Sequence, residues 1–111
     1  MEHIQRSGEL AGAVAPGALV TGSDYVVTEH KTLTVRHLTV SKQGIGDVYL
    51  QEVSAAGVVQ YSLPIHFPAA GIVAFENLHF RVRSQNTARV FVNDGAGPAS
   101  QTECFWSGAE E

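Results

Sequence analysis

From Tyr25 onward, apolar and polar residues alternate with a period of two, in short runs separated by turn residues. The clearest run, Val59–Phe67, carries an apolar side chain at every odd position. Because successive side chains of a strand point to opposite faces, this alternation is typical of strands that bury one face. No segment shows the apolar period of an amphipathic helix. The pattern therefore restricts the chain to an all-β fold.

The alternation predicts about eight short strands, with turn signals roughly every eight to twelve residues. Antiparallel strands at this spacing are expected to form a two-sheet sandwich. The main predicted strands are Tyr25–Glu29, Lys31–Ser41, Val48–Val53, Val59–Phe67, Ile72–Glu76, a run through Leu78–Val82, Thr87–Asn93 and Gln101–Ser107.

The apolar positions change parity twice, at Arg36-His37 and near Glu76-Asn77. One extra residue at such a point, a β-bulge, would keep both halves of a strand facing the core. Strands that bend in the middle are typical of jelly rolls, so we predict a jelly-roll sandwich rather than an immunoglobulin-type one. Pro64 cannot donate to a ladder and predicts that its strand lies at a sheet edge or is broken there.

The two ends of the chain differ from its middle. Residues 1–22 are rich in Ala and Gly and contain no aromatic residue, so we expect an extended N-terminal arm, with one short strand at Leu19–Thr21. We expect the β domain to span residues 23–107 and a flexible tail to span 108–111. The start of the chain does not resemble a secretory signal, and Leu10–Val20 is too short and interrupted to cross a bilayer.

The composition excludes several function classes. The net charge of −4 and the 16% content of charged residues are unfavourable for a general nucleic-acid binder. The sequence contains no metal-ligand motif, nucleophile elbow or phosphate loop, so we predict no catalytic residue, cofactor or metal. We interpret the single cysteine, Cys104, as a buried small hydrophobe, and it suits folding in a reducing cytoplasm.

Three arginines stand out. Matching the apolar faces of Phe80–Val82 and Ala88–Val90 predicts a hairpin in which Arg81 lies opposite Arg89, with Arg83 diagonal to Arg89. Like charges in this position disfavour pairing, and no acidic residue lies on this hairpin. One interpretation is a solvated arginine face screened by salt. The other is that the arginines bind carboxylates of a partner protein.

Taken whole, the chain resembles the small decoration or staple proteins on the capsids of tailed bacteriophages, most closely that of epsilon-fifteen-like Salmonella phages. The resemblance covers the whole length and rests on overall format. An Ala/Gly-rich segment, SGELAGAVAPGALVTGSDY, precedes a β core that includes KTLTVRHLTVSKQ, DVYLQEV, GIVAFENLHFRVRSQ and TARVFVND.

The resemblance implies a jelly-roll protein on the outer surface of an icosahedral virion, made in the cytoplasm of the host bacterium. Such a protein would clamp neighbouring major capsid subunits against the pressure of packaged DNA, often as a homodimer or homotrimer. It would have no enzymatic activity, cofactor, direct nucleic-acid contact or membrane contact. The residues that we expect at the partner interface are Arg81, Arg83, Arg89, Trp106, Leu10, Val14 and Leu19.

Two other classes of function stay open. A carbohydrate-binding jelly roll, lectin-like or receptor-binding, would need an exposed Trp106, Tyr25, Tyr49 or Tyr61 beside Asp or Asn in a groove. A small cupin-type metal enzyme would need clustered histidines, such as His37, His66 and His79.

Overall fold

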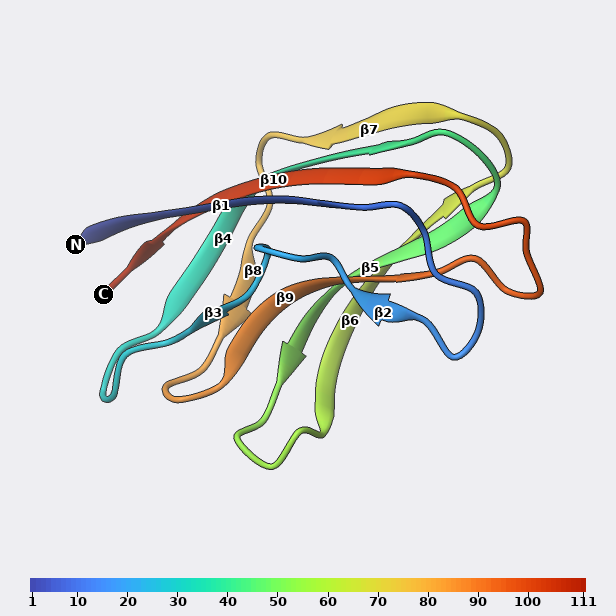
Figure 1. Ribbon diagram of the computed structural model, residues 1–111. Helices are drawn as coiled ribbons and strands as arrows, with labels where there is room; N and C mark the ends of the chain where they lie inside the picture. The colour runs from blue at the N-terminus through green and yellow to red at the C-terminus, as the bar shows by residue number, and fades with distance from the viewer.

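The computed structural model describes residues 1–111 and consists of strands joined by turns (Figure 1). The prediction of an all-β fold is confirmed. No helix is long and apolar enough to cross a membrane. The ten strands are β1 (Glu2–Leu10), β2 (Ala18–Leu19), β3 (Tyr25–Val26), β4 (Leu33–Lys42), β5 (Gly46–Val53), β6 (Val59–Phe67), β7 (Gly71–Phe75), β8 (Phe80–Val82), β9 (Thr87–Asn93) and β10 (Thr102–Glu110).

The strands form two antiparallel sheets of five strands each, which pack together as a sandwich. In sheet A the order is β1-β10-β4-β7, and β8 also pairs with β4. In sheet B the order is β2-β9-β5-β6, and β3 also pairs with β9. The expected two-sheet sandwich is therefore present.

The pairing follows the course of one long folded hairpin. The β5–β6 turn is the tip of this hairpin. Moving outward from the tip, β4 pairs with β7 and β8, β2 and β3 pair with β9, and β1 pairs with β10. The outermost pair brings Glu2 opposite Glu110. The two ends of the chain consequently lie side by side (Figure 1).

The core lies between the sheets and is built from alternate residues of both inner faces. Trp106 is its largest fully buried side chain. The Trp106 indole Nε1 donates a hydrogen bond to the Ser23 carbonyl oxygen at 2.7 Å, which satisfies the only polar atom of the ring. The other members are mainly Val and Leu, including Leu33, Val35, Leu38, Val40, Val48, Leu50, Val82, Ala88, Val90 and Val92.

The β-bulge predicted in the long strand is confirmed. Along β10 and β4, His37 pairs with Ser107 but Val35 pairs with Gly108, so Arg36 is the extra residue of β4. Arg36 and His37 are both exposed, while Leu38 and Val35 on either side are buried. The extra residue thus keeps both halves of β4 facing the core.

The second parity switch coincides with a change of strand. β7 ends at Phe75, β8 begins at Phe80, and both pair with β4, on either side of its bulge. The Leu78 amide donates to the Arg36 carbonyl oxygen at 2.9 Å, which joins the two irregular points. The connection and the bulge therefore bend sheet A at the same place.

Strand β6 has the predicted bounds and lies at the edge of sheet B, as Pro64 indicated. Its apolar face is covered only in part. Ile65 and Phe67 are buried, whereas Val59 is 42% exposed and Tyr61 is 65% exposed. The first half of β6 therefore extends past the end of the core, which the alternation alone could not show.

The expectation of an N-terminal arm over residues 1–22 is wrong. Glu2–Leu10 pairs with β10 at nine successive positions and forms the edge of sheet A. Ile4 is buried, and the Thr21 carbonyl approaches Gly8 so closely that a Cβ at this position would collide with its oxygen. The composition of this segment was misleading, because a strand that is held by backbone hydrogen bonds needs few large side chains. The predicted strand at Leu19–Thr21 is present as β2 and an isolated bridge at Thr21.

The expectation of a flexible tail over residues 108–111 is also wrong. β10 continues to Glu110, which is 1% exposed. The Glu110 carboxylate accepts hydrogen bonds from the Tyr25 hydroxyl at 2.8 Å and from the amide and hydroxyl of Thr28 at 2.8 and 2.9 Å. Glu111 and Thr32 exchange two backbone hydrogen bonds. These contacts fix the end of the chain.

The position of Trp106 yields a stability prediction. Trp106→Ala is expected to lower the free energy of unfolding by about 3–5 kcal/mol, because it empties a large volume at the centre of the core. Phe105→Ala, on the outer face of the same strand, is the matched control and is expected to cost less than about 1 kcal/mol. Urea unfolding measures both, and equal losses would contradict this assignment of faces.

Candidate functional site

The predicted arginine hairpin does not form. β8 pairs with β4 in sheet A, whereas β9 pairs with β5 in sheet B, so residues 83–86 cross from one sheet to the other. Arg81 lies opposite Thr34, and Arg89 lies opposite Gln51. The matching apolar faces do point into the core, but from opposite sheets. Parity shows which face of a strand is buried, not which sheet the strand joins.

Arg83 is held by a buried carboxylate. The Arg83 Nε lies 3.1 Å from Glu52 Oε2, its Nη2 donates to Oε1 at 3.3 Å, and its backbone amide donates to Oε2 at 2.8 Å. Asn86 Nδ2 donates to the same carboxylate at 3.0 Å. Burial raises the pKa of Glu52, but the hydrogen bonds from Arg83 and Asn86 outweigh it and lower the pKa overall. Glu52 thus fastens the 83–86 crossing onto β5.

Arg81 lies at the open edge of the sandwich, where β6 of one sheet faces β8 of the other. A groove of about 350 Å³ runs between them. Its apolar lining consists of Tyr61, Leu63 and Phe80, and its polar lining includes His79 and Arg81. The exposed Arg81 makes no ion pair with any carboxylate. We call this feature the β6–β8 groove.

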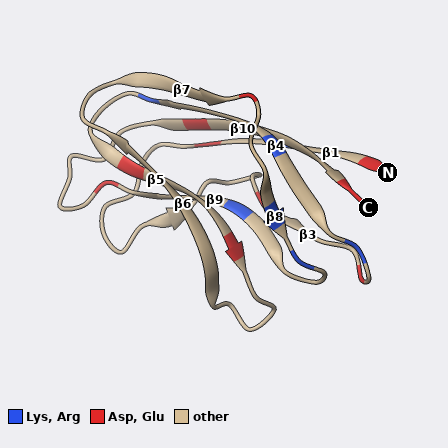
Figure 2. Ribbon diagram, turned by 180° about the vertical axis from the view of Figure 1, so that it is seen from behind, with Lys and Arg blue, Asp and Glu red and all other residues tan.

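A second depression adjoins Arg81. Arg81 and Arg36 line a shallow depression on the outer face of sheet A, together with Glu111. Arg83 lies beside the β6–β8 groove, with its guanidinium carbon 5.9 Å from the centre of the Tyr61 ring. Figure 2 marks one basic position on β8 of sheet A and one on β9 of sheet B.

Arg89 lies away from the groove, on the outer face of sheet B. Its Nε donates to Gln51 Oε1 at 2.9 Å, and its guanidinium carbon lies 5.1 Å from the centre of the Phe91 ring. Partial burial lowers the pKa of Arg89, against the opposing charge of Asp24. The three arginines therefore do not form one cluster.

The other predicted partner residues divide by exposure. Trp106 is fully buried and cannot touch a partner, so its expected role is wrong. Leu10 is half-buried and packs against the core, and Leu19 is half-buried beside Phe91 on the outer face of sheet B. Val14 is 48% exposed in the connection between β1 and β2.

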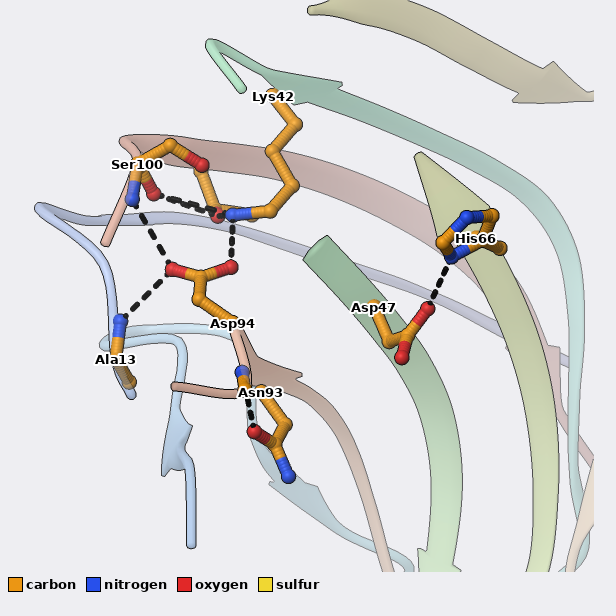
Figure 3. Close-up of polar contacts among 9 residues, drawn as sticks. Ala13, Lys42, Asp47, His66, Asn93, Asp94 and Ser100 are labelled. Atoms are coloured by element: carbon orange, nitrogen blue, oxygen red, sulfur yellow. Dashed lines mark hydrogen bonds and ion pairs between the residues drawn. The ribbon is translucent and has the colours of Figure 1, made fainter. Parts of the chain in front are cut away.

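A buried ion pair joins the loops at the opposite end of the sandwich (Figure 3). Lys42 Nζ lies 2.5 Å from Asp94 Oδ1, and both side chains are fully buried. Asp94 Oδ2 accepts hydrogen bonds from the amides of Ala13 and Ser100, each at 3.1 Å, and Lys42 donates to the Ser100 carbonyl and the Thr102 hydroxyl. Burial raises the pKa of Asp94, but Lys42 and the two amides outweigh it and lower the pKa overall. The pair therefore holds β4 and β9 together with the loops at their ends.

The burial of Lys42 and Glu52 was not predicted from the sequence, although their positions in the strands indicated it. Lys42 has the parity of the core-facing Val40, and Glu52 has the parity of the core-facing Leu50. A charged residue in a core-facing register is unusual and indicates a buried partner.

The histidines and the cysteine form no metal site. No group of three or more His, Cys, Asp and Glu side chains is arranged to hold a metal ion. His66 Nδ1 pairs with Asp47 Oδ1 at 2.6 Å on the outer face of sheet B. Burial raises the pKa of the Cys104 thiol to about 11, so the thiol is protonated near neutral pH.

Comparison with known proteins gives little information about function. No protein-family model and no curated protein matches the chain. Among solved structures, the chain is similar to the crystal structure of PirA, with a TM-score of 0.47 and 16% sequence identity, over 96% of this chain and 93% of that one. A likeness this distant supports no argument about function.

The Lys42–Asp94 pair yields a second prediction. Asp94→Asn is expected to lower the free energy of unfolding by about 3–5 kcal/mol, because it leaves a buried ammonium without its counter-ion. Adding Lys42→Met is expected to recover more than half of that loss, since the oxygen of the introduced carboxamide can still accept both backbone amides. Urea unfolding of the single and double variants tests this. An Asp94→Asn loss below about 1 kcal/mol would mean that the pair behaves like an exposed one.

The lowered pKa of Glu52 yields a prediction on pH. Its stabilising effect is complete above the ordinary Glu pKa of 4.5 and is lost as the pH falls through the lower pKa of the folded state. Glu52→Gln is therefore expected to reduce stability by about 1–3 kcal/mol at neutral pH, and the difference from wild type should shrink below pH 4.5. The exposed Glu29→Gln is the control, and a difference independent of pH would contradict the assignment.

Proposed function

We propose that the chain is a structural, non-enzymatic protein that decorates the outer surface of an icosahedral phage shell and clamps neighbouring major capsid subunits. The observation that carries the proposal is the β6–β8 groove, with the unpaired Arg81 on its rim. Protein interfaces combine an apolar centre with a polar rim and are enriched in Tyr, Phe and Arg. An acidic segment of a capsid subunit would fit this surface.

The strand connections support the jelly-roll part of the proposal. If β2 and β3 count as one strand and β7 and β8 as another, the sandwich has eight strands. The chain then crosses between the sheets at every connection except the β5–β6 turn. Jelly rolls are double-sheet sandwiches of eight strands, which is the architecture proposed for this chain.

The outer face of sheet A is a second surface for packing against a capsid subunit. Phe105, 41% exposed, stands in a row with Ser7, Thr39 and Ala74 on neighbouring strands. Ile72, in the next row of the same face, is 72% exposed, so this face carries apolar surface for a partner to cover. Self-association as a dimer or trimer, together with contacts to several capsid subunits, would raise avidity through repetition.

Co-sedimentation with shells that lack the decoration protein tests the proposal. Wild-type protein is expected to sediment with the shells. Arg81→Glu is expected to weaken binding by at least about tenfold, since it places a negative charge where an acidic segment would bind. Lys31→Glu, an equal charge change at an exposed loop position, is the matched control. A folded wild-type protein that fails to bind shells would exclude the function.

A further inference from the structure

The outer face of sheet B carries an arrangement of side chains that the proposed function does not use. No strand packs on this face, and the backbone at Gly17 lies against the edge of the Phe91 ring. Across its centre runs a row formed by cross-strand neighbours, in the order Leu19, Phe91, Tyr49 and Pro64. The next row along the strands holds Arg89, Gln51 and Ser62.

The central row presents two aromatic rings as partly exposed neighbours. Tyr49 and Phe91 are directly paired residues of β5 and β9, and both are half-buried. Paired residues on one face of a sheet bring their Cβ atoms within about 5 Å of each other. The Arg89 guanidinium lies over the Phe91 ring, so the neighbouring Tyr49 ring is the apolar surface against which the C–H face of a sugar ring can stack.

Arg89 supplies a charge beside this platform. Only its Nε is engaged by a side-chain acceptor, Gln51 Oε1, and the guanidinium forms no ion pair. The two terminal nitrogens of the guanidinium are available to a ligand. Such a planar donor pair binds a carboxylate in a bidentate manner. Asp24 is the acidic residue in the same region, and its charge opposes the effect of burial on Arg89.

A depression of about 410 Å³ is lined by Arg89 and by Leu19 of the central row, a volume within the range of small-ligand sites. Its polar lining includes Asp24, Ser54, Gln85 and Thr87, whose oxygen and nitrogen atoms suit sugar hydroxyls. Its apolar lining consists of Leu19, Val26, Val53 and Ala55. Arg89 thus lies beside both features: its guanidinium carbon is 5.1 Å from the centre of the Phe91 ring, and its side chain lines the depression.

We infer that the outer face of sheet B binds an acidic oligosaccharide, with one sugar ring on Tyr49 beside Phe91, the next in the depression, and a sugar carboxylate on Arg89. The aromatic rings and the amide and hydroxyl groups favour a sugar over a bare anion. The unpaired guanidinium favours a uronic or sialic acid over a neutral sugar. This inference is independent of the shell-binding surface, since Arg81 lies on the other sheet.

Titration of the isotope-labelled full-length protein tests the inference by amide chemical shifts. The probes are trigalacturonate with its methyl ester, and sialyllactose with lactose. We expect at least one acidic probe to bind, with shifts confined to β5, β9 and the residues that line the depression. Its neutral counterpart is expected to bind at least about tenfold more weakly.

Two pairs of variants locate the site. Arg89→Gln and Tyr49→Ala are each expected to weaken binding by at least about tenfold, while Arg81→Gln and Tyr61→Ala, which lie outside the face, leave it unchanged. Amide spectra of the free variants report whether each is folded. Lack of binding of every acidic probe at about 10 mM, or unchanged binding by a folded Arg89→Gln, would overturn the inference.

Shell binding separates this inference from the proposed function. If Arg89→Gln loses co-sedimentation with shells and no acidic sugar binds the wild type, the face docks protein and the sugar inference fails alone. If acidic sugars bind and the wild type does not sediment with shells, the proposed function fails alone.

Discussion

The structure depends on the way in which β4 keeps its apolar side facing inward over ten residues while the sheet around it bends. β4 pairs with β10 on one side, and with β7 and β8 in turn on the other. Arg36, the extra residue, lets Leu33 and Val35 face the core together with Leu38 and Val40. Without it, half of the strand would turn its apolar side chains to solvent. The break between β7 and β8 is the matching adjustment in the neighbouring strand.

Much of this could be predicted from the sequence, because side-chain alternation is a local property. The bounds of β6 and β9 were predicted to the residue, and the bulge at Arg36-His37 and the edge position of Pro64 were also correct. Each of these depends only on the chain within a few residues. The all-β sandwich follows from the same local signals.

The features that were mispredicted depend on distant partners. β1 and the last residues of β10 contain few large apolar side chains, and they are ordered because each supplies backbone partners for the other. The hairpin expected for Arg81 and Arg89 failed because parity cannot assign a strand to one of two sheets. The partners of Glu52 and Lys42, which are Arg83 and Asp94, lie far away in the sequence and meet them only in the fold.

The pairing of Glu2 with Glu110 has a practical consequence for handling the molecule. Because the first and last strands run side by side, a short linker can join the original ends, and the chain can be reopened elsewhere without breaking a pair of strands. The exposed β5–β6 turn is the natural place for new ends, because a side chain added at Gly57 would meet no other atom within 4 Å. A cargo fused to either original end would leave the molecule from the same corner, so a doubly tagged protein would carry both tags together.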